Sequence, residues 1–176
     1  MSYLVISCSL NQSSYSKILA QEATLRLKQA AEEVEFIDLQ QIPLPLCDGD
    51  RAYSDPNVTL IKNSIVHAQG IVLGVPIYNY DVNAACKNLI ELTGKAWEGK
   101  AVGFACAAGS RSSYMSIMGL ANSLILDYRC HILPRFLYTV ESSFTDDKLE
   151  DTEIHQRLDI LITELRRLTH GLFEKV

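Results

Sequence analysis

The chain has 176 residues, of which 48% are hydrophobic and 21% charged, so we expect one globular domain over residues 1–176 rather than a disordered chain. Its net charge of −5 disfavours a nucleic-acid partner, because binding to a polyanion needs basic surface. The five cysteines form no CxxC pair, which argues against a metal site or a disulfide framework. The apolar runs are too short to cross a membrane. We therefore expect a reduced, cytoplasmic protein with no membrane partner.

Short β-branched segments alternate along the chain with segments of helical periodicity. Tyr3–Cys8 is apolar throughout, as expected for a strand buried on both faces. Apolar residues then recur every three or four positions from Tyr15 to Ala30, which predicts a helix. The alternation continues with strands expected at 34–39, 70–76, 100–106 and 130–140, helices at 58–67, 82–93, 113–127 and 154–172, and a loop at 41–57.

Five strands that alternate with five helices predict an α/β domain with three layers, in which helices cover both faces of a parallel sheet. Ligands of such sheets bind at the carboxyl ends of the strands. The segments that follow the first, third and fourth strands, residues 9–16, 76–83 and 107–113, are therefore the candidates for a functional site.

The first of these segments, Ser9–Ser16, is rich in hydroxyl groups and leads directly into a helix. Free backbone N–H groups and serine side chains at a helix start are suited to binding an anion. Because the segment contains no glycine, it is not a P-loop, and a terminal monophosphate fits better than a pyrophosphate. The alternative is that these serines only cap the helix.

The other two segments supply flat and polar surface. Residues 76–83 contain two tyrosines and two asparagines, which suits a heteroaromatic ring, although the same residue types are common in turns. Residues 107–113 combine small side chains with Arg111, a cation that would favour a ring carrying negative charge. The alternative is an ordinary exposed arginine.

Two of these segments resemble motifs of the NADPH-dependent FMN reductase family, whose flavodoxin-like members include quinone, azo-compound and chromate reductases. Residues Ile6–Leu10 with Ser14 resemble the strand end and phosphate loop of that family, and Pro76-Ile-Tyr-Asn79 with Lys87-Asn88 resembles its Pro-x-Tyr-Asn motif. The resemblance covers about residues 3–140. It implies a five-stranded parallel sheet in the order 2-1-3-4-5, bound FMN, and NADPH or NADH as co-substrate.

The resemblance also implies a set of cofactor-binding residues and no catalytic side chain, since the flavin carries the chemistry. In the phosphate loop these are Ser9, Asn11, Ser14 and Ser16, with Tyr15 as a backbone donor. Along the ribityl chain and the ring they are Pro76, Tyr78, Asn79 and Tyr80. At the pyrimidine edge they are Gly109, Ser110 and Arg111.

The implied function is an NAD(P)H oxidoreductase that passes hydride through FMN to a small acceptor such as a flavin, a quinone or an azo compound. One alternative is an electron carrier of the flavodoxin type. Another is a binding module that has lost the flavin, because Cys8 and Asn11 stand where the family usually has glycine and arginine. Cys8 also follows the first strand close to a helix start, where a thiol pKa can be lowered, so a redox role for Cys8 stays open.

Members of this family usually dimerise through helices that flank the flavin, so the resemblance implies a homodimer or a homotetramer. Here those helices are the ones expected at 82–93 and 113–127. Met115, Ile117, Met118 and Leu120 offer more apolar surface than one buried stripe needs, which indicates either an interface or a wholly buried helix.

Overall fold

A parallel sheet forms the centre of the computed structural model, which describes residues 1–174. The strands lie in the order β2-β1-β3-β5, and β6 and β7 both pair with β5 at the far edge. This is the predicted order 2-1-3-4-5, the one typical of flavodoxin-like domains. The strands are β1 (Ser2–Ser7), β2 (Glu33–Asp38), β3 (Gly70–Tyr78), β5 (Ala101–Ala108), β6 (His131–Ile132) and β7 (Leu137–Val140).

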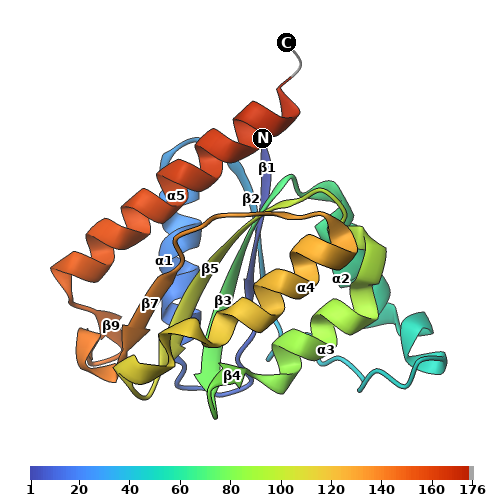
Figure 1. Cartoon of the computed structure of the whole chain (residues 1–176), viewed down its shortest axis with the longest axis horizontal. Helices are drawn as coiled ribbons and strands as arrows, with labels where there is room; N and C mark the ends of the chain where they lie inside the picture. The colour runs from blue at the N-terminus through green and yellow to red at the C-terminus, as the bar shows by residue number, and fades with distance from the viewer. Residues whose placement is uncertain (175–176) are drawn as a thin grey trace.

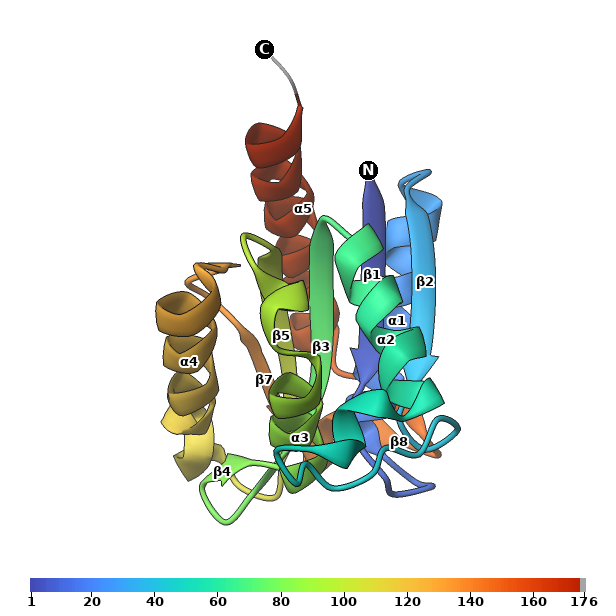
Figure 2. The same cartoon turned by 90° about the vertical axis from the view of Figure 1, so that its right-hand side faces the viewer.

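Helices cover both faces of this sheet, as Figures 1 and 2 show. One face is packed by α1 (Tyr15–Gln29) and α5 (Thr152–Phe173), which bury Leu19 and Leu158 among others. The opposite face is packed by α2 (Pro56–His67), α3 (Ala84–Thr93) and α4 (Met118–Tyr128). The predicted three layers are confirmed. None of the described helices is both long and apolar enough to cross a membrane.

The structure corrects several predicted boundaries. The fifth strand, expected at 130–140, is interrupted between β6 and β7, where Pro134 has no N–H to donate and restricts the residue before it. The expected helix at 113–127 begins with a 3-10 segment, η3 (Arg111–Ile117), and becomes α-helical at Met118. Helix α2 begins earlier than expected because Asp55 accepts a hydrogen bond from the N–H of Asn57 and Pro56 fits the first turn.

Short elements were not predicted. The strand β4 (Asp81–Val82) turns back on β3, and a hairpin of β8 (Phe144–Thr145) and β9 (Lys148–Leu149) connects β7 with α5 through η4 (Glu141–Ser143). The loop at 41–57 contains η1 (Arg51–Ser54), and η2 (Gly94–Trp97) follows α3. The single domain expected over residues 1–176 stays a prediction, and residues 175 and 176 lie outside the described part.

Gly74 permits a close approach between α1 and β3. A Cβ atom at this position would lie 2.7 Å from the backbone oxygen of Ser16 and 2.8 Å from the Cβ of Ala20. Since neither neighbour is the flexible end of a long side chain, only glycine fits without a shift of α1. The first turn of α1 therefore lies directly over the central strand.

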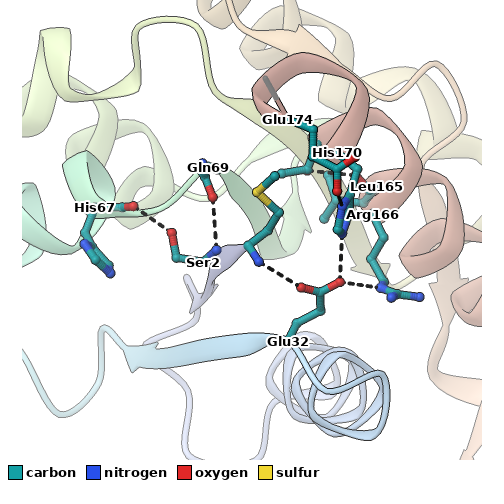
Figure 3. Close-up of polar contacts among 10 residues, drawn as sticks. Ser2, Glu32, His67, Gln69, Leu165, Arg166, His170 and Glu174 are labelled. Carbon is teal, nitrogen blue, oxygen red and sulfur yellow. Dashed lines mark hydrogen bonds and ion pairs between the residues drawn. The ribbon is translucent and has the colours of Figure 1, made fainter. Parts of the chain in front are cut away.

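A buried carboxylate joins three parts of the chain at the opposite end of the sheet (Figure 3). Glu32, whose side chain is 6% exposed, accepts hydrogen bonds from the amino group of Met1 at 3.2 Å, Arg166 at 2.8 Å and His170 at 3.1 Å. Burial alone would raise the pKa of Glu32, but the donors outweigh it and lower the pKa to about 2. Hydrogen bonds to Glu174 and Glu32 raise the pKa of His170.

We predict that Glu32→Gln lowers the free energy of unfolding at pH 6 by about 2 kcal/mol. The pKa of Glu32 is lower in the folded state, so its contribution is present above about pH 4.5 and is lost as the pH falls toward 2. The pKa of His170 is raised in the folded state. Its contribution to the free energy of unfolding is therefore present below about pH 6.5 and is lost as the pH rises through the pKa of His170 in the folded protein.

Denaturant unfolding of wild type and variant between pH 3 and pH 8 measures this difference. The control is Glu33→Gln, which removes the same charge from a side chain that is 73% exposed. A difference between wild type and Glu32→Gln that stays constant from pH 3 to pH 6 would contradict the account.

Candidate functional site

The three segments that follow β1, β3 and β5 line one pocket of about 640 Å³. It contains every cofactor-binding residue expected from the sequence except Ser9 and Arg111. The lining residues are Asn11, Ser13, Ser14, Tyr15, Ser16, Pro76, Ile77, Tyr78, Asn79, Tyr80, Ala107, Ala108, Gly109, Ser110, Ser113 and Glu141. The volume lies in the range of small-molecule sites.

The loop after β1 is held by its own side chains. The Ser9 hydroxyl accepts from the N–H of Asn11 at 3.2 Å, and the Asn11 amide exchanges two hydrogen bonds with the backbone of Ser13, at 3.0 and 3.2 Å. Ser9 is buried beneath the loop surface and supports the loop through this hydrogen bond, which explains why it does not line the pocket. Asn11 shapes the loop in addition to lining the pocket.

The start of α1 forms one end of the pocket. Ser14 caps the helix by accepting from the N–H of Lys17 at 3.3 Å, and its hydroxyl lies 3.0 Å from that of Ser16. Ser14 thus caps the helix and also lines the pocket, so capping does not remove it from the candidate site. Free N–H groups, two hydroxyls and the positive end of a 15-residue helix make this end suited to an anion.

No lysine or arginine within residues 1–174 lines the pocket. The ammonium of Lys17, in the first turn of α1, lies 2.7 Å from the buried carboxylate of Asp38. Arg111 is exposed, and its guanidinium contributes, after the hydroxyl of Ser143 and backbone donors, to the lowered pKa of Asp151 at the start of α5. Among the described residues, the pocket lining therefore offers only neutral donors to an anion.

Two tyrosines border the middle of the pocket on the tight turn between β3 and β4. Asn79 and Tyr80 have φ values of 51° and 67°, as a two-residue hairpin turn of type I′ requires. Asparagine tolerates this conformation, whereas for tyrosine it costs energy, and the Tyr80 hydroxyl is held by the carbonyl of Ser112 at 2.8 Å. Tyr78 and Tyr80 stay 51% and 60% exposed, so they offer aromatic surface to a ligand.

The turn after β5 closes the other side. The Tyr138 hydroxyl donates to the carbonyl of Ser110, and the Tyr114 ring lies edge-on to Tyr138 with centroids 5.5 Å apart. A Cβ atom built on Gly109 would meet no atom within 4 Å. Since Gly109 lines the pocket, its missing side chain leaves space for a ligand rather than for the protein.

Glu141 is a pocket residue that the sequence did not indicate. It follows β7, whose last residue, Val140, pairs with Ala108, so Glu141 lies one step beyond the end of the sheet. Its carboxylate accepts a hydrogen bond from the Tyr15 hydroxyl at 3.1 Å, and this bond raises the pKa of Tyr15. The unpredicted β8–β9 hairpin supports the contact, because Phe144 stacks on Tyr15 with centroids 4.5 Å apart.

The thiol of Cys8 is buried and is not activated by the start of α1. Its side chain is fully buried, and a hydrogen bond with Cys86, together with burial, raises the pKa of its thiol well above the ordinary value. The expected lowering by a helix start is wrong, because the side chain points into the core rather than toward α1.

Two other sequence features lie away from the pocket. The Asn88 side chain binds the long loop instead, accepting from the N–H of Cys47 at 2.8 Å and donating to the carbonyl of Pro45 at 2.9 Å. None of the residues at 41–57 lines the pocket. Across the described part of the chain, no group of three or more His, Cys, Asp or Glu residues is placed to hold a metal ion.

Comparison with known proteins adds the family. Residues 1–143 match the family model described as NADPH-dependent FMN reductase. An NAD(P)H-dependent FAD/FMN reductase of Geobacillus thermodenitrificans (strain NG80-2) is 26% identical in an alignment of 154 positions that covers 84% of this chain and 83% of that protein.

Two solved structures share the fold. The apo form of the NADH:FMN oxidoreductase EMOB superposes with a TM-score of 0.80 at 19% identity, covering 99% of this chain and 91% of that one. The flavoenzyme NAD(P)H:(acceptor) oxidoreductase FerB from Paracoccus denitrificans gives 0.79 at 18% identity, with 97% and 98% covered. Because the family model covers more than half of its length, the chain belongs to the NADPH-dependent FMN reductase family of oxidoreductases.

Proposed function

We propose that the protein binds FMN in the pocket at the carboxyl ends of β1, β3 and β5 and transfers hydride from NADPH or NADH to a small acceptor such as a flavin, a quinone or an azo compound. The observation that carries this proposal is that one pocket joins a helix start rich in hydroxyls to two exposed tyrosines and a turn in which Gly109 leaves open space. These are the features that a phosphate, a sugar chain and a flat ring need.

The phosphate would lie at the start of α1. The hydroxyls of Ser14 and Ser16 lie 3.0 Å apart, so one would donate to its neighbour and the other to the phosphate, and the free N–H groups at the helix start would complete the site. Ser9 and Asn11 would keep the loop in this shape from within, since both already take part in its hydrogen bonds.

The ring would lie between the β3–β4 turn and the turn after β5. Tyr78, Asn79 and Tyr80, with Pro76 below them, would contact its face and the ribityl chain. Gly109 and Ser110 would border its edge, where backbone groups can hydrogen-bond to ring atoms. In this structure Arg111 is exposed and outside the lining residues, so its proposed contact with the pyrimidine edge would need a change of side-chain conformation.

Bound FMN would supply the hydride acceptor and donor, so the chain needs to bind, orient and exclude water rather than to provide a nucleophile. The exposed faces of Tyr78 and Tyr80 leave the pocket open on one side, where a nicotinamide and then an acceptor would stack in turn. An aromatic surface that is open to solvent in this way suits flat acceptors of several kinds.

The test measures FMN binding from the change in its visible absorption, and NADPH oxidation with a quinone acceptor, for wild type and Gly109→Val. Because a side chain at 109 meets open space in the fold, we expect unchanged thermal stability but at least tenfold weaker FMN binding and lower turnover. Gly171→Val, which changes a glycine of α5 outside both the pocket and the proposed interface, is the control for FMN binding.

A wild-type protein that binds no FMN would contradict the proposal and favour a binding module. FMN binding without NADPH or NADH oxidation would favour an electron carrier.

We also propose that the protein is a homo-oligomer of the reducing cytoplasm. All five cysteines are free, as is usual for that compartment. Ile117 and Leu120 are buried, but Met115, Met118 and Leu126 stay 55%, 38% and 80% exposed, so the alternative of a wholly buried helix is wrong. An apolar stripe of this kind supports an interface between copies.

Sedimentation velocity tests the oligomer. We expect a dimer or tetramer for wild type and a shift toward monomer for Leu126→Lys, with Leu60→Lys on α2 as the control. A monomeric wild type at tens of micromolar would contradict it.

A further inference from the structure

We propose that the negative charge of Glu141 weakens the binding of a flavin that carries a phosphate on its ribityl chain. Glu141 would thereby determine how strongly the pocket distinguishes FMN from riboflavin. The inference rests on the proposed function, since it concerns the same pocket. It gives a role to a residue that neither the sequence nor the resemblance indicated.

Glu141 is the one charged side chain among the described residues that line the pocket. Its partner is the neutral hydroxyl of Tyr15, at 3.1 Å, rather than a cation. Tyr15 is the first residue of α1, directly after the loop that would bind the phosphate. The hydrogen bond therefore brings the carboxylate of Glu141 to the side chain of a residue that belongs to the helix start.

The cations nearest in sequence to this end do not balance the carboxylate. Lys17 is paired at 2.7 Å with Asp38, whose side chain is only 7% exposed, and neither Lys17 nor Arg111 lines the pocket. Asn11 stands in the loop without charge. A phosphate carrying between one and two negative charges would therefore enter a pocket whose own side chains carry one negative charge.

The position of Glu141 is fixed by the fold rather than by the ligand. The residue before it, Val140, pairs with Ala108 in the sheet, and Phe144 stacks on Tyr15 from the hairpin that follows. These contacts hold the backbone on both sides of Glu141, and in this structure the hydrogen bond from Tyr15 keeps the exposed carboxylate at the pocket, where it would repel a bound anion. Across a pocket of this size two such charges are within a Debye length of each other.

The consequence concerns selectivity. Hydrogen bonds from Ser14, Ser16 and the helix start favour the phosphate, whereas Glu141 opposes it. The two effects partly cancel, so the pocket should bind riboflavin, which has a hydroxyl in place of the phosphate, nearly as tightly as FMN. Removing the charge of Glu141 should restore a preference for FMN.

The test is a four-way comparison of dissociation constants, for FMN and for riboflavin, with wild type and Glu141→Gln, measured by quenching of flavin fluorescence at low salt. Glutamine keeps the shape and an oxygen that can accept from Tyr15. We expect FMN to bind about tenfold more tightly to the variant and riboflavin to change by less than twofold. Added salt should weaken the difference for FMN.

Glu150→Gln is the matched control, because it removes the same charge from an exposed residue of the following segment that does not line the pocket. It should leave both flavins unchanged.

An equal change in the two dissociation constants would overturn the inference, since Glu141 would then act on the ring or on the fold. FMN binding to the variant that is unchanged or weaker would also overturn it. Binding of neither flavin to either protein would instead overturn the proposed function, and the inference with it.

Discussion

The close packing of α1 against β3 is the constraint on which the pocket depends. Because Gly74 has no side chain, the first turn of α1 lies over the central strand, with Ser16 in the space that a Cβ atom would need. This places the loop after β1 beside the end of β3, where Tyr78 and Tyr80 emerge. A second link joins the same loop to the start of α3, since the Asn83 side chain donates to the carbonyl of Cys8 at 2.7 Å. The hydroxyl-rich start of α1 and the aromatic turn are therefore positioned as one unit.

Among the described residues, no lysine or arginine lines the pocket. In the loop that we propose for the phosphate, the chain has Asn11, which carries no charge, and Lys17 is paired with the buried carboxylate of Asp38. What is left for an anion is a set of neutral donors, whose hydrogen bonds are directional and depend little on salt. Glu141 adds a negative charge at the edge of this set. We propose that the balance between these contributions, rather than any one cation, would set which flavin the pocket prefers.

Much of the fold was predictable from the sequence, because buried parallel strands and amphipathic helices have distinct periodicities. The strand order followed from the family resemblance. The elements that escaped prediction are those decided by local chemistry. Pro134 divides the last strand, and the paired aspartates Asp146 and Asp147, with φ values of 48° and 57°, form a hairpin turn between strands of only two residues. Such short strands carry no periodic signal.

The candidate site was also predictable only in part. The three loops were predictable because the carboxyl ends of parallel strands meet at one edge. The inward role of Ser9 and the outward position of Arg111 were not, because the sequence does not show which way a loop side chain points. Glu141 was not predictable either, since it reaches the pocket through an unpredicted segment and a contact with Tyr15, 126 positions away.

The central claim, that bound FMN accepts hydride from a nicotinamide in this pocket, is tested most directly by rapid mixing of the FMN-loaded protein with NADPH, and separately with NADH, without oxygen. The account predicts that the visible absorbance of the flavin bleaches at least as fast as the enzyme turns over with an acceptor under the same conditions. Flavin that binds but is bleached by neither nucleotide, or is bleached more slowly than turnover, would contradict it.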